Sequence, residues 1–246
     1  MKKALLVVAA MVVSAMVLVG CGEKDVQGSV APKETQEVQT DQAQTMEETT
    51  TESTTEDSYV SLGGFDGGVY TNKYVGIGCN LDENWQFYSA EKLQELPGAV
   101  KELLEGSDIS EYLDENTVQI MDMKAENVND LTTINLVLTR LSFQERLAYK
   151  LMTEEETVDE TLKMSDMMIS SYAQAGMDVT EMEKVMVTFL GEEHAAIKTS
   201  CKVGDVDQYL LQFFFYQKGS YGATLTLTSY VEDRTEDLAK LFYVVE

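Results

Sequence analysis

The sequence predicts an α+β fold in which an antiparallel β-sheet is flanked by helices. Segments of strand character follow one another along the chain, once as a pair and later four in a row, and such runs favour antiparallel pairing. Segments with apolar residues at helical spacing separate these groups. Residues 59–246 are long enough to bury the core of one domain without a metal or a disulfide.

The first part of this domain contains a glycine-rich segment and a strand. We expect residues 61–68 (SLGGFDGG) to be a flexible lead-in, because a phosphate-binding loop would run into a helix bearing Lys and Ser or Thr. Residues 74–81 alternate with period two, which predicts a half-buried strand. Its inward face would carry Val75, Ile77, Cys79 and Leu81.

A turn and a helix are expected next. Residues 82–84 (DEN) have side chains that bond nearby backbone N–H groups and so favour a turn. Residues 90–105 have a helical apolar stripe, which Pro97 should interrupt. We expect Trp85 to pack the end of the first strand against this helix.

The middle of the domain predicts two strands and two helices. Residues 117–127 and 132–141 are the strands, joined by a turn at 129–131. A short helix is expected at 144–152. A longer one is expected at 156–175, beginning with a capping box of Thr157 and Glu160 and ending at Gly176.

The C-terminal part predicts a four-stranded meander followed by a helix. Residues 185–190 and 194–203 would form a hairpin across the GEE turn. Residues 209–216 (YLLQFFFY) are almost continuously apolar, which predicts a central strand covered on both faces. Residues 223–230 would be the last strand, with leucines alternating with threonines, and residues 234–242 would form the closing helix.

The N-terminus is typical of an exported lipoprotein. Lys2 and Lys3 precede an apolar run at 4–19, which is shorter than the roughly 20 residues that span a bilayer but suits a signal peptide. The run ends in LVGC, which resembles the bacterial lipobox. This resemblance implies that residues 1–20 are removed and that Cys21, acylated on sulfur with fatty acids such as palmitate, becomes the new N-terminus.

Residues 21–58 are expected to be a disordered acidic tether after the lipidated cysteine. The segment is rich in Thr and Glu and has no aromatic residue, so it cannot bury enough apolar surface to order itself. A flexible coil of this length reaches about 30–35 Å. With 43 acidic and 18 basic residues, the chain has a net charge of −25, which argues against nucleic acid as a partner.

Two motifs resemble those of the PsbP-like superfamily. They are Y-x-N-x-x-V-G-I at 70–77, followed by a polar turn and Trp85, and T-x-I-N-L-V-L-T-R-L at 132–141. Many members have a proline where this chain has Asp82, so its turn must be held by side-chain hydrogen bonds. The resemblance implies an α/β/α sandwich and non-catalytic work, such as docking onto partners, and it transfers no catalytic residue.

The sequence offers no strong catalytic or metal site. His194 is the single histidine, and the apolar strand that follows it favours packing over a role in a catalytic triad. One histidine is too few for a zinc site. Asp205 and Asp207 lack the loop pattern of a calcium site. We therefore expect no cofactor and no metal.

Cys79 and Cys201 are the cysteines that remain once Cys21 is lipidated. Both fall on the inward parity of their strands. A disulfide between them is allowed outside the cytoplasm, and the alternative is two buried thiols that behave as small hydrophobic residues. The second interpretation is favoured.

Two functions remain open from the sequence. The first is a non-enzymatic binding or assembly module, anchored to the extracytoplasmic face of the cell membrane through acylated Cys21, whose partner is a protein or a cell-wall component. The second is a surface hydrolase or a solute-binding lipoprotein with a carboxylate-based site. The second function requires a deep pocket in which carboxylates converge.

Overall fold

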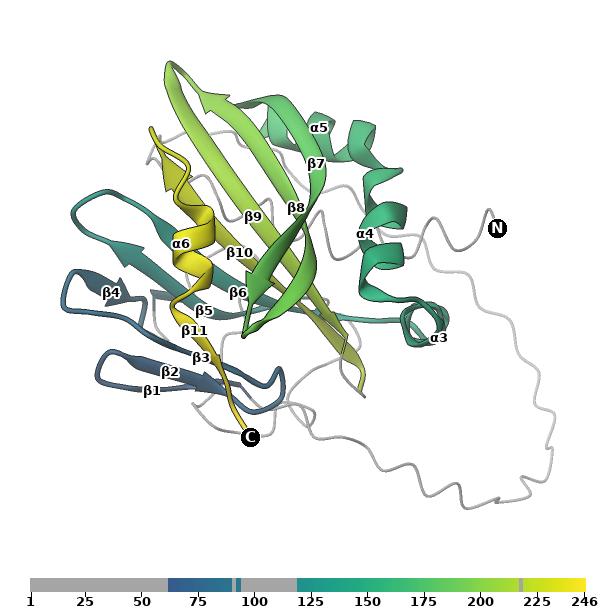
Figure 1. The fold of residues 1–246 in the computed structure, drawn as a ribbon, viewed down its shortest axis with the longest axis horizontal. Coiled ribbons are helices and arrows are strands. Elements are labelled where there is room, and N and C mark those ends of the chain that lie inside the picture. Colours follow the sequence, from purple (N-terminus) through teal and green to yellow (C-terminus); the bar gives the residue numbers. More distant parts are fainter. Residues whose placement is uncertain (1–61, 90–91, 94–118, 217–218) are drawn as a thin grey trace, which may run out of the picture. The chain divides into compact units, whose positions relative to one another are not determined.

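The computed structural model describes residues 62–89, 92–93, 119–216 and 219–246 (Figure 1). The segments predicted as signal peptide and tether, Cys21, and most of the helix predicted at 90–105, with Pro97, lie outside the described residues. Within the described residues the strands form one four-stranded and one seven-stranded sheet, and all their pairings are antiparallel. The α+β fold with antiparallel sheet and flanking helices is therefore confirmed.

The small sheet has the order β1-β2-β3-β11 and the large sheet the order β4-β5-β6-β10-β9-β8-β7. The strands are β1 Gly64–Asp66, β2 Val69–Asn72, β3 Ile77–Asn80, β4 Trp85–Phe87, β5 Gln119–Asn127, β6 Thr133–Arg140, β7 Met177–Phe189, β8 Glu192–Val203, β9 Val206–Tyr216, β10 Tyr221–Tyr230 and β11 Phe242–Val244. The helices are α3 Phe143–Leu151, α4 Glu154–Leu162, α5 Ser165–Gln174 and α6 Thr235–Ala239.

The small sheet differs from what the sequence predicted in two ways. The glycine-rich segment is not a flexible lead-in, because residues 64–66 form β1 and turn into β2 at Gly67, whose φ of 60° suits glycine. The end of the last predicted helix is instead β11, which places Phe242 opposite Cys79. The small sheet thus joins the first strands of the domain to its last one.

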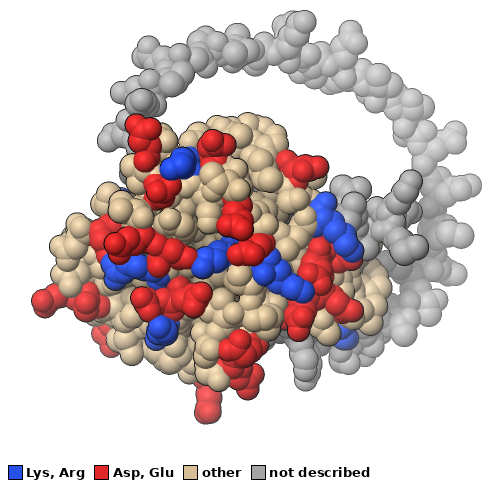
Figure 2. Space-filling view, turned by 45° about the horizontal axis from the view of Figure 1, so that its top comes forward, with Lys and Arg blue, Asp and Glu red and all other residues tan. Residues whose placement is uncertain are grey.

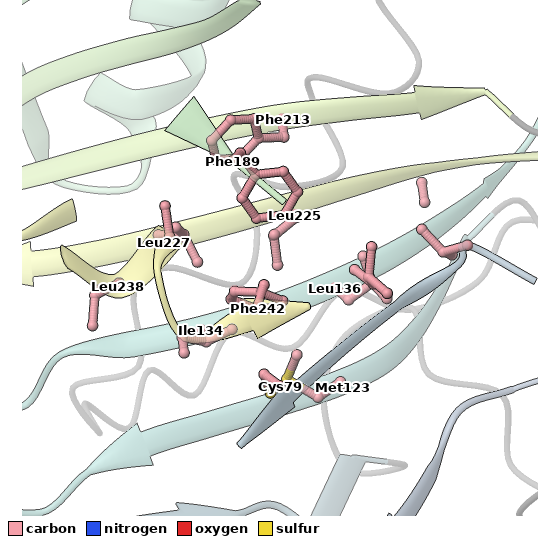
Figure 3. Packing of buried hydrophobic residues seen from close by; sticks show 14 of the residues in the cluster. Cys79, Met123, Ile134, Leu136, Phe189, Phe213, Leu225, Leu227, Leu238 and Phe242 are labelled. Atoms are coloured by element: carbon pink, nitrogen blue, oxygen red, sulfur yellow. The ribbon is translucent and has the colours of Figure 1, made fainter. Parts of the chain in front are cut away.

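The main hydrophobic core lies between the small sheet with α6 and one face of the large sheet (Figure 3). Val75, Ile77, Cys79 and Leu81 all belong to it, as the period of that segment predicted. The predicted single sheet is wrong because the chain changes sheets after β3. The turn between β3 and β4 is held by Asp82, whose carboxylate accepts a hydrogen bond from Asn84 N at 2.9 Å.

Trp85 lies in β4, at the edge of the large sheet, and packs against the main core. The ring is half-buried, less than the sequence suggested. The expected contact with the helix at 90–105 lies outside the described residues.

Helices α3, α4 and α5 cover the other face of β7, β8 and β9 and enclose a second cluster with Cys201. The single long helix predicted at 156–175 is wrong, since the chain breaks at Lys163 and Met164 into α4 and α5. The capping box lies one turn earlier than predicted, on Thr153 and Glu156. A capping box on Ser142 and Glu145 likewise begins α3.

The middle of the large sheet also buries polar side chains. Thr224, Thr226 and Thr228 of β10 are fully buried. The sequence showed that they alternate with leucines but did not predict their burial. Gln212 of β9 links this layer to α5, because it accepts a hydrogen bond from the Tyr172 hydroxyl at 3.2 Å and donates one to Thr226 at 3.3 Å. The predicted central strand is therefore covered on both faces, one face apolar and the other partly polar.

A buried carboxylate joins the two sheets. Asp122 is the extra residue of a β-bulge in β5 and is 4% exposed. Its Oδ1 accepts a hydrogen bond from Gly63 N at 2.8 Å, and its Oδ2 accepts one from Asn72 Nδ2 at 2.6 Å and bonds the Tyr70 hydroxyl. The bulge also shifts the register, so that Ile120 and Met123, three residues apart, face the same core.

The partners of Asp122 are themselves fixed in place. Asn72 Oδ1 accepts a hydrogen bond from Val75 N at 2.8 Å, so its amide must present Nδ2 to the carboxylate. Gly63 is held close to the Tyr70 ring, and a Cβ there would lie 2.2 Å from a ring carbon. Each carboxylate oxygen therefore faces a donor that cannot reorient.

We expect Asp122→Asn to lower the free energy of unfolding by about 2–3 kcal/mol, because the new amide must turn its own N–H₂ toward either Gly63 N–H or the Asn72 amide. Urea denaturation measures the change. Asp205→Asn, at an exposed turn, is the matched control and should change it by less than about 0.5 kcal/mol. An equal effect of the two variants would contradict the role of Asp122.

The same group predicts a pH dependence. Burial raises the pKa of Asp122 above its ordinary value, although hydrogen bonds from Tyr70, Gly63 and Asn72 oppose this. The raised pKa therefore adds stability that is fully present below the unfolded pKa, about 3.9, and that part alone is lost as pH rises through the folded pKa. The free energy of unfolding of the native chain should fall over that interval relative to Asp122→Asn, and parallel curves would contradict this.

Candidate functional site

A pocket of about 280 Å³ lies where α3 and α4 meet the ends of β8 and β9. This volume is at the small end of the range of ligand pockets. Its lining residues are Tyr149 of α3, Met152 of the link between the two helices, Glu154 and Thr157 of α4, His194 of β8, and Phe214, Phe215 and Tyr216 of β9.

The chain positions this pocket by short connections. Helix α3 ends at Leu151 and α4 begins at Glu154, so only two residues separate the helices. The two-residue turn of Leu190 and Gly191, both with positive φ, returns the chain from β7 into β8 and so places His194 near the start of that strand. The predicted hairpin is confirmed, but its turn is Leu190–Gly191 rather than GEE, because Glu192 and Glu193 pair with β7.

His194 and Glu154 form the polar part of the pocket. His194 Nδ1 lies 3.1 Å and 3.2 Å from the two carboxylate oxygens of Glu154. A carboxylate only accepts hydrogen bonds, so we assign the hydrogen to Nδ1. Phe189 holds the imidazole from another side, with the two rings edge to face at 5.7 Å. The ring is thereby oriented, and Nε2 is the nitrogen that can bond a further group.

Aromatic rings form the apolar part. Tyr149 and Tyr216 stack with their centroids 5.7 Å apart. The Tyr149 hydroxyl is buried and has no hydrogen-bond partner within the described part of the chain. Burial, and secondarily the charge of Glu145, raises the pKa of Tyr149, so the hydroxyl stays protonated at neutral pH. It therefore offers a donor that nothing described takes up.

The described lining of the pocket holds an oriented imidazole but supplies no activated nucleophile. An imidazole oriented by a carboxylate is two-thirds of a catalytic triad. Among the lining residues, Thr157 has the one aliphatic hydroxyl, and that hydroxyl donates to Thr153 O at 3.0 Å. The lining residues include a single carboxylate, so carboxylates do not converge here.

The sequence did not predict this arrangement. It assigned His194 to packing beside Glu192 and Glu193, yet the structure brings the ring to Glu154, forty residues earlier. Glu193 instead accepts a hydrogen bond from Thr188 at 2.6 Å. The strand predicted at 209–216 to be covered on both faces is so at Phe213, at 0% exposure, whereas Phe215 and Tyr216 at its end are half-buried. No spacing in the sequence links residues so far apart.

The two remaining cysteines are free thiols in separate clusters. Cys79 belongs to the main core, and Cys201 belongs to the cluster under α3, α4 and α5. Burial raises the pKa of Cys79 to about 12 and that of Cys201 to about 11, so both stay un-ionised and unreactive. The disulfide that the sequence left open is not formed. Cys21 lies outside the described residues.

Charged side chains elsewhere are paired with one another. Asp207 accepts a hydrogen bond from Lys202 at 2.7 Å, so its carboxylate has a cationic partner. A hollow of about 270 Å³ around α6 is lined only by charged residues, among them the pair of Lys240 and Asp237 at 2.7 Å. On the face drawn in Figure 2, most basic side chains lie beside acidic ones rather than gathering in a patch. The described residues contain no cluster of three or more potential metal ligands.

The methionines at 164, 167 and 168 do not form a binding face. Met164 and Met168 are buried, at 7% and 1% exposure, and Met167 points outward. Over the described ranges no helix is long and apolar enough to cross a membrane.

Comparison with known proteins found similarity only among solved structures. No family model matches the chain, and no curated protein matches it. The solution structure of cyanobacterial PsbP (CyanoP) from Synechocystis is similar with a TM-score of 0.40 and 11% identity, over 78% of this chain and 98% of that one. The crystal structure of LpqN, involved in cell envelope biogenesis of Mycobacterium tuberculosis, is similar with a TM-score of 0.34 and 10% identity, over 69% and 83%.

The unpartnered hydroxyl of Tyr149 yields a matched pair of substitutions. We expect Tyr149→Phe to leave the free energy of unfolding unchanged or to raise it by about 1 kcal/mol, because it removes a buried polar group without a partner. Tyr172→Phe, which loses the bond to Gln212, should lower it by about 1 kcal/mol. Urea denaturation of both variants checks this, and a loss at Tyr149 as large as at Tyr172 would contradict it.

Proposed function

We propose that this chain is a lipoprotein of the cell envelope, anchored through acylated Cys21 on the extracytoplasmic face of the membrane, and that its domain is a non-catalytic binding module. The lipobox and the acidic tether support the anchor. The observation that most supports binding is the pocket, whose lining combines aromatic side chains with an oriented imidazole–carboxylate pair.

The chemistry of the lining indicates the ligand class. Four aromatic rings favour a flat apolar or aromatic body. Glu154 accepts hydrogen bonds and attracts a cation, and rings such as Tyr216 add to that attraction. A small aromatic amine therefore fits the pocket better than an anion does, and its volume limits the ligand to the size of a fragment or of one side chain of a larger partner.

The alternative of a surface hydrolase meets half of its requirement. His194 and Glu154 supply a base and its orienting group, but the one aliphatic hydroxyl of the described lining, on Thr157, already donates to Thr153 O, and no cysteine thiol lies in that lining. The alternative of a solute-binding lipoprotein shares the same pocket and differs only in whether a free molecule or part of a larger partner occupies it. The lining thus favours binding over hydrolysis.

The single histidine and the single tryptophan make the pocket directly testable. We expect phenethylamine to shift the His194 imidazole resonances in the NMR spectrum, with a Kd of about millimolar for so small a compound, and to leave the indole resonance of Trp85 unchanged. Trp85 lies in β4, at the far edge of the large sheet from β8.

A pair of neighbouring substitutions separates specific from general effects. Glu154→Gln should weaken binding of phenethylamine about tenfold and that of neutral 2-phenylethanol little, since only the amine gains from the carboxylate charge. Glu155→Gln, whose carboxylate faces Lys184 instead, is the matched control. Unmoved His194 resonances at saturating amine, or equal losses in the two variants, would refute this pocket.

The anchor has its own test. Expressed with its signal sequence in a bacterium that processes lipoproteins, the chain should lose residues 1–20, gain the mass of the lipid on Cys21 and partition into detergent. Cys21→Ala should do none of these. A native chain without added lipid mass would contradict the anchor and leave the pocket hypothesis standing.

A further inference from the structure

Helix α3 carries an exposed apolar stripe. Phe143, Leu147 and Leu151 are 71%, 50% and 76% exposed, although they are large apolar residues. They are spaced four residues apart, so at about 100° per residue they lie within one stripe about 80° wide that runs the length of the helix.

The stripe points away from the described part of the domain. The buried residues of α3 are Glu145 and Tyr149, which lie on the opposite side of the helix from the stripe. An amphipathic helix of a globular protein normally turns its apolar stripe to the core. Here the core side is held by an aromatic ring and a capping carboxylate, and the apolar side is presented outward.

The charge on this helix is also opposite to that of the chain. Arg146 and Lys150 flank the stripe, with the Arg146 guanidinium 6.0 Å from the Phe143 ring. The one acid in the helix, Glu145, is buried and occupied in the capping box with Ser142. The outer face of α3 is thus cationic and apolar in a protein whose net charge is −25.

Acidic residues of the next helix are directed elsewhere. Glu155 and Asp159 of α4 both pair with Lys184 of β7, at 3.7 Å and 2.8 Å. They are engaged with the edge strand of the large sheet, and the cations of α3 have no such partner among the ion pairs of the described residues.

We infer that α3 docks onto an anionic phospholipid bilayer, with its apolar stripe at the boundary between headgroups and acyl chains and Arg146 and Lys150 at the lipid phosphates. Exposed apolar residues flanked by Lys and Arg are the signature of interfacial helices. A second copy of this chain is a poorer occupant, because a symmetric contact through α3 would set Arg146 and Lys150 of one copy against the same cations of the other.

This inference rests on the proposed anchor at Cys21. A helix of only nine residues binds a membrane weakly by itself. The anchor and a tether that reaches about 30–35 Å keep α3 at high effective concentration beside the bilayer, which converts weak docking into the prevailing state. Because Tyr149 on the inner side of α3 lines the pocket, docking would hold the pocket close to the membrane surface.

The test uses the full lipidated chain in vesicles of phosphatidylcholine with phosphatidylglycerol. A nitrobenzoxadiazole probe is attached at Leu147→Cys, and Val206→Cys is the control, at 44% exposure and the opposite end of β9 from the pocket. Cys21 is acylated and the other two thiols are buried, so labelling is specific. Doxyl-labelled lipid should quench the Leu147 probe at least twofold and leave the Val206 probe unchanged.

Substitutions then separate the two contributions. Phe143→Ser with Leu151→Ser should abolish the quenching in every lipid mixture. Arg146→Gln with Lys150→Gln should reduce quenching in anionic vesicles to the level seen in pure phosphatidylcholine. Equal quenching of the Leu147 and Val206 probes, in a chain that floats with the vesicles, would overturn docking while leaving the anchor intact.

Two more outcomes are informative. The first distinguishes a bilayer on α3 from a protein partner on α3. The second distinguishes docking of α3 from anchoring through Cys21. A Leu147 probe shielded from aqueous iodide but not quenched by doxyl lipid would mean that protein covers α3, and it would overturn the bilayer as occupant. A chain that stays at the bottom of the flotation gradient contradicts the anchor. The Leu147 measurement is then repeated with vesicles in excess, where absence of quenching overturns docking on its own.

Discussion

The buried carboxylate of Asp122 is the interaction on which the two-sheet arrangement depends. The small sheet contains few strands and short ones, and such a sheet has little stability of its own. It is tied to the large sheet by donors from Gly63, Tyr70 and Asn72 that converge on one bulge in β5. A half-satisfied polar network inside a protein costs more than an apolar one, so these four groups specify one alignment of the sheets.

The two faces of the large sheet are covered by different elements. On one side it packs against the small sheet and α6 through the main core. On the other it supports α3, α4 and α5 and, at the ends of β8 and β9, the pocket with His194 and Glu154. The two sides of helix α3 differ: the inner side contributes Tyr149 to the pocket, and the outer side exposes the apolar stripe.

Much of the fold could be predicted from the sequence, because period-two alternation and turn residues are local signals. The strand with Cys79 and the hairpin before His194 were predicted from such signals. Asp82 also accepts the side-chain hydrogen bond that the absence of a proline at this turn predicted. The bulge at Asp122 could not be predicted, since it depends on donors from another sheet. The pocket could not either, because Glu154 and His194 are brought together only by the packing of α4 on β8.

The closing strand β11 has a consequence for how the protein is made. It pairs with β3, so residues near the start and the end of the domain are neighbours in the small sheet. Such long-range pairing forms late, since the loop between the partners must close first. During synthesis the small sheet cannot be completed until residues 242–244 have left the ribosome. Completion of this sheet, and of the core that Phe242 shares with Cys79, is therefore a post-translational step.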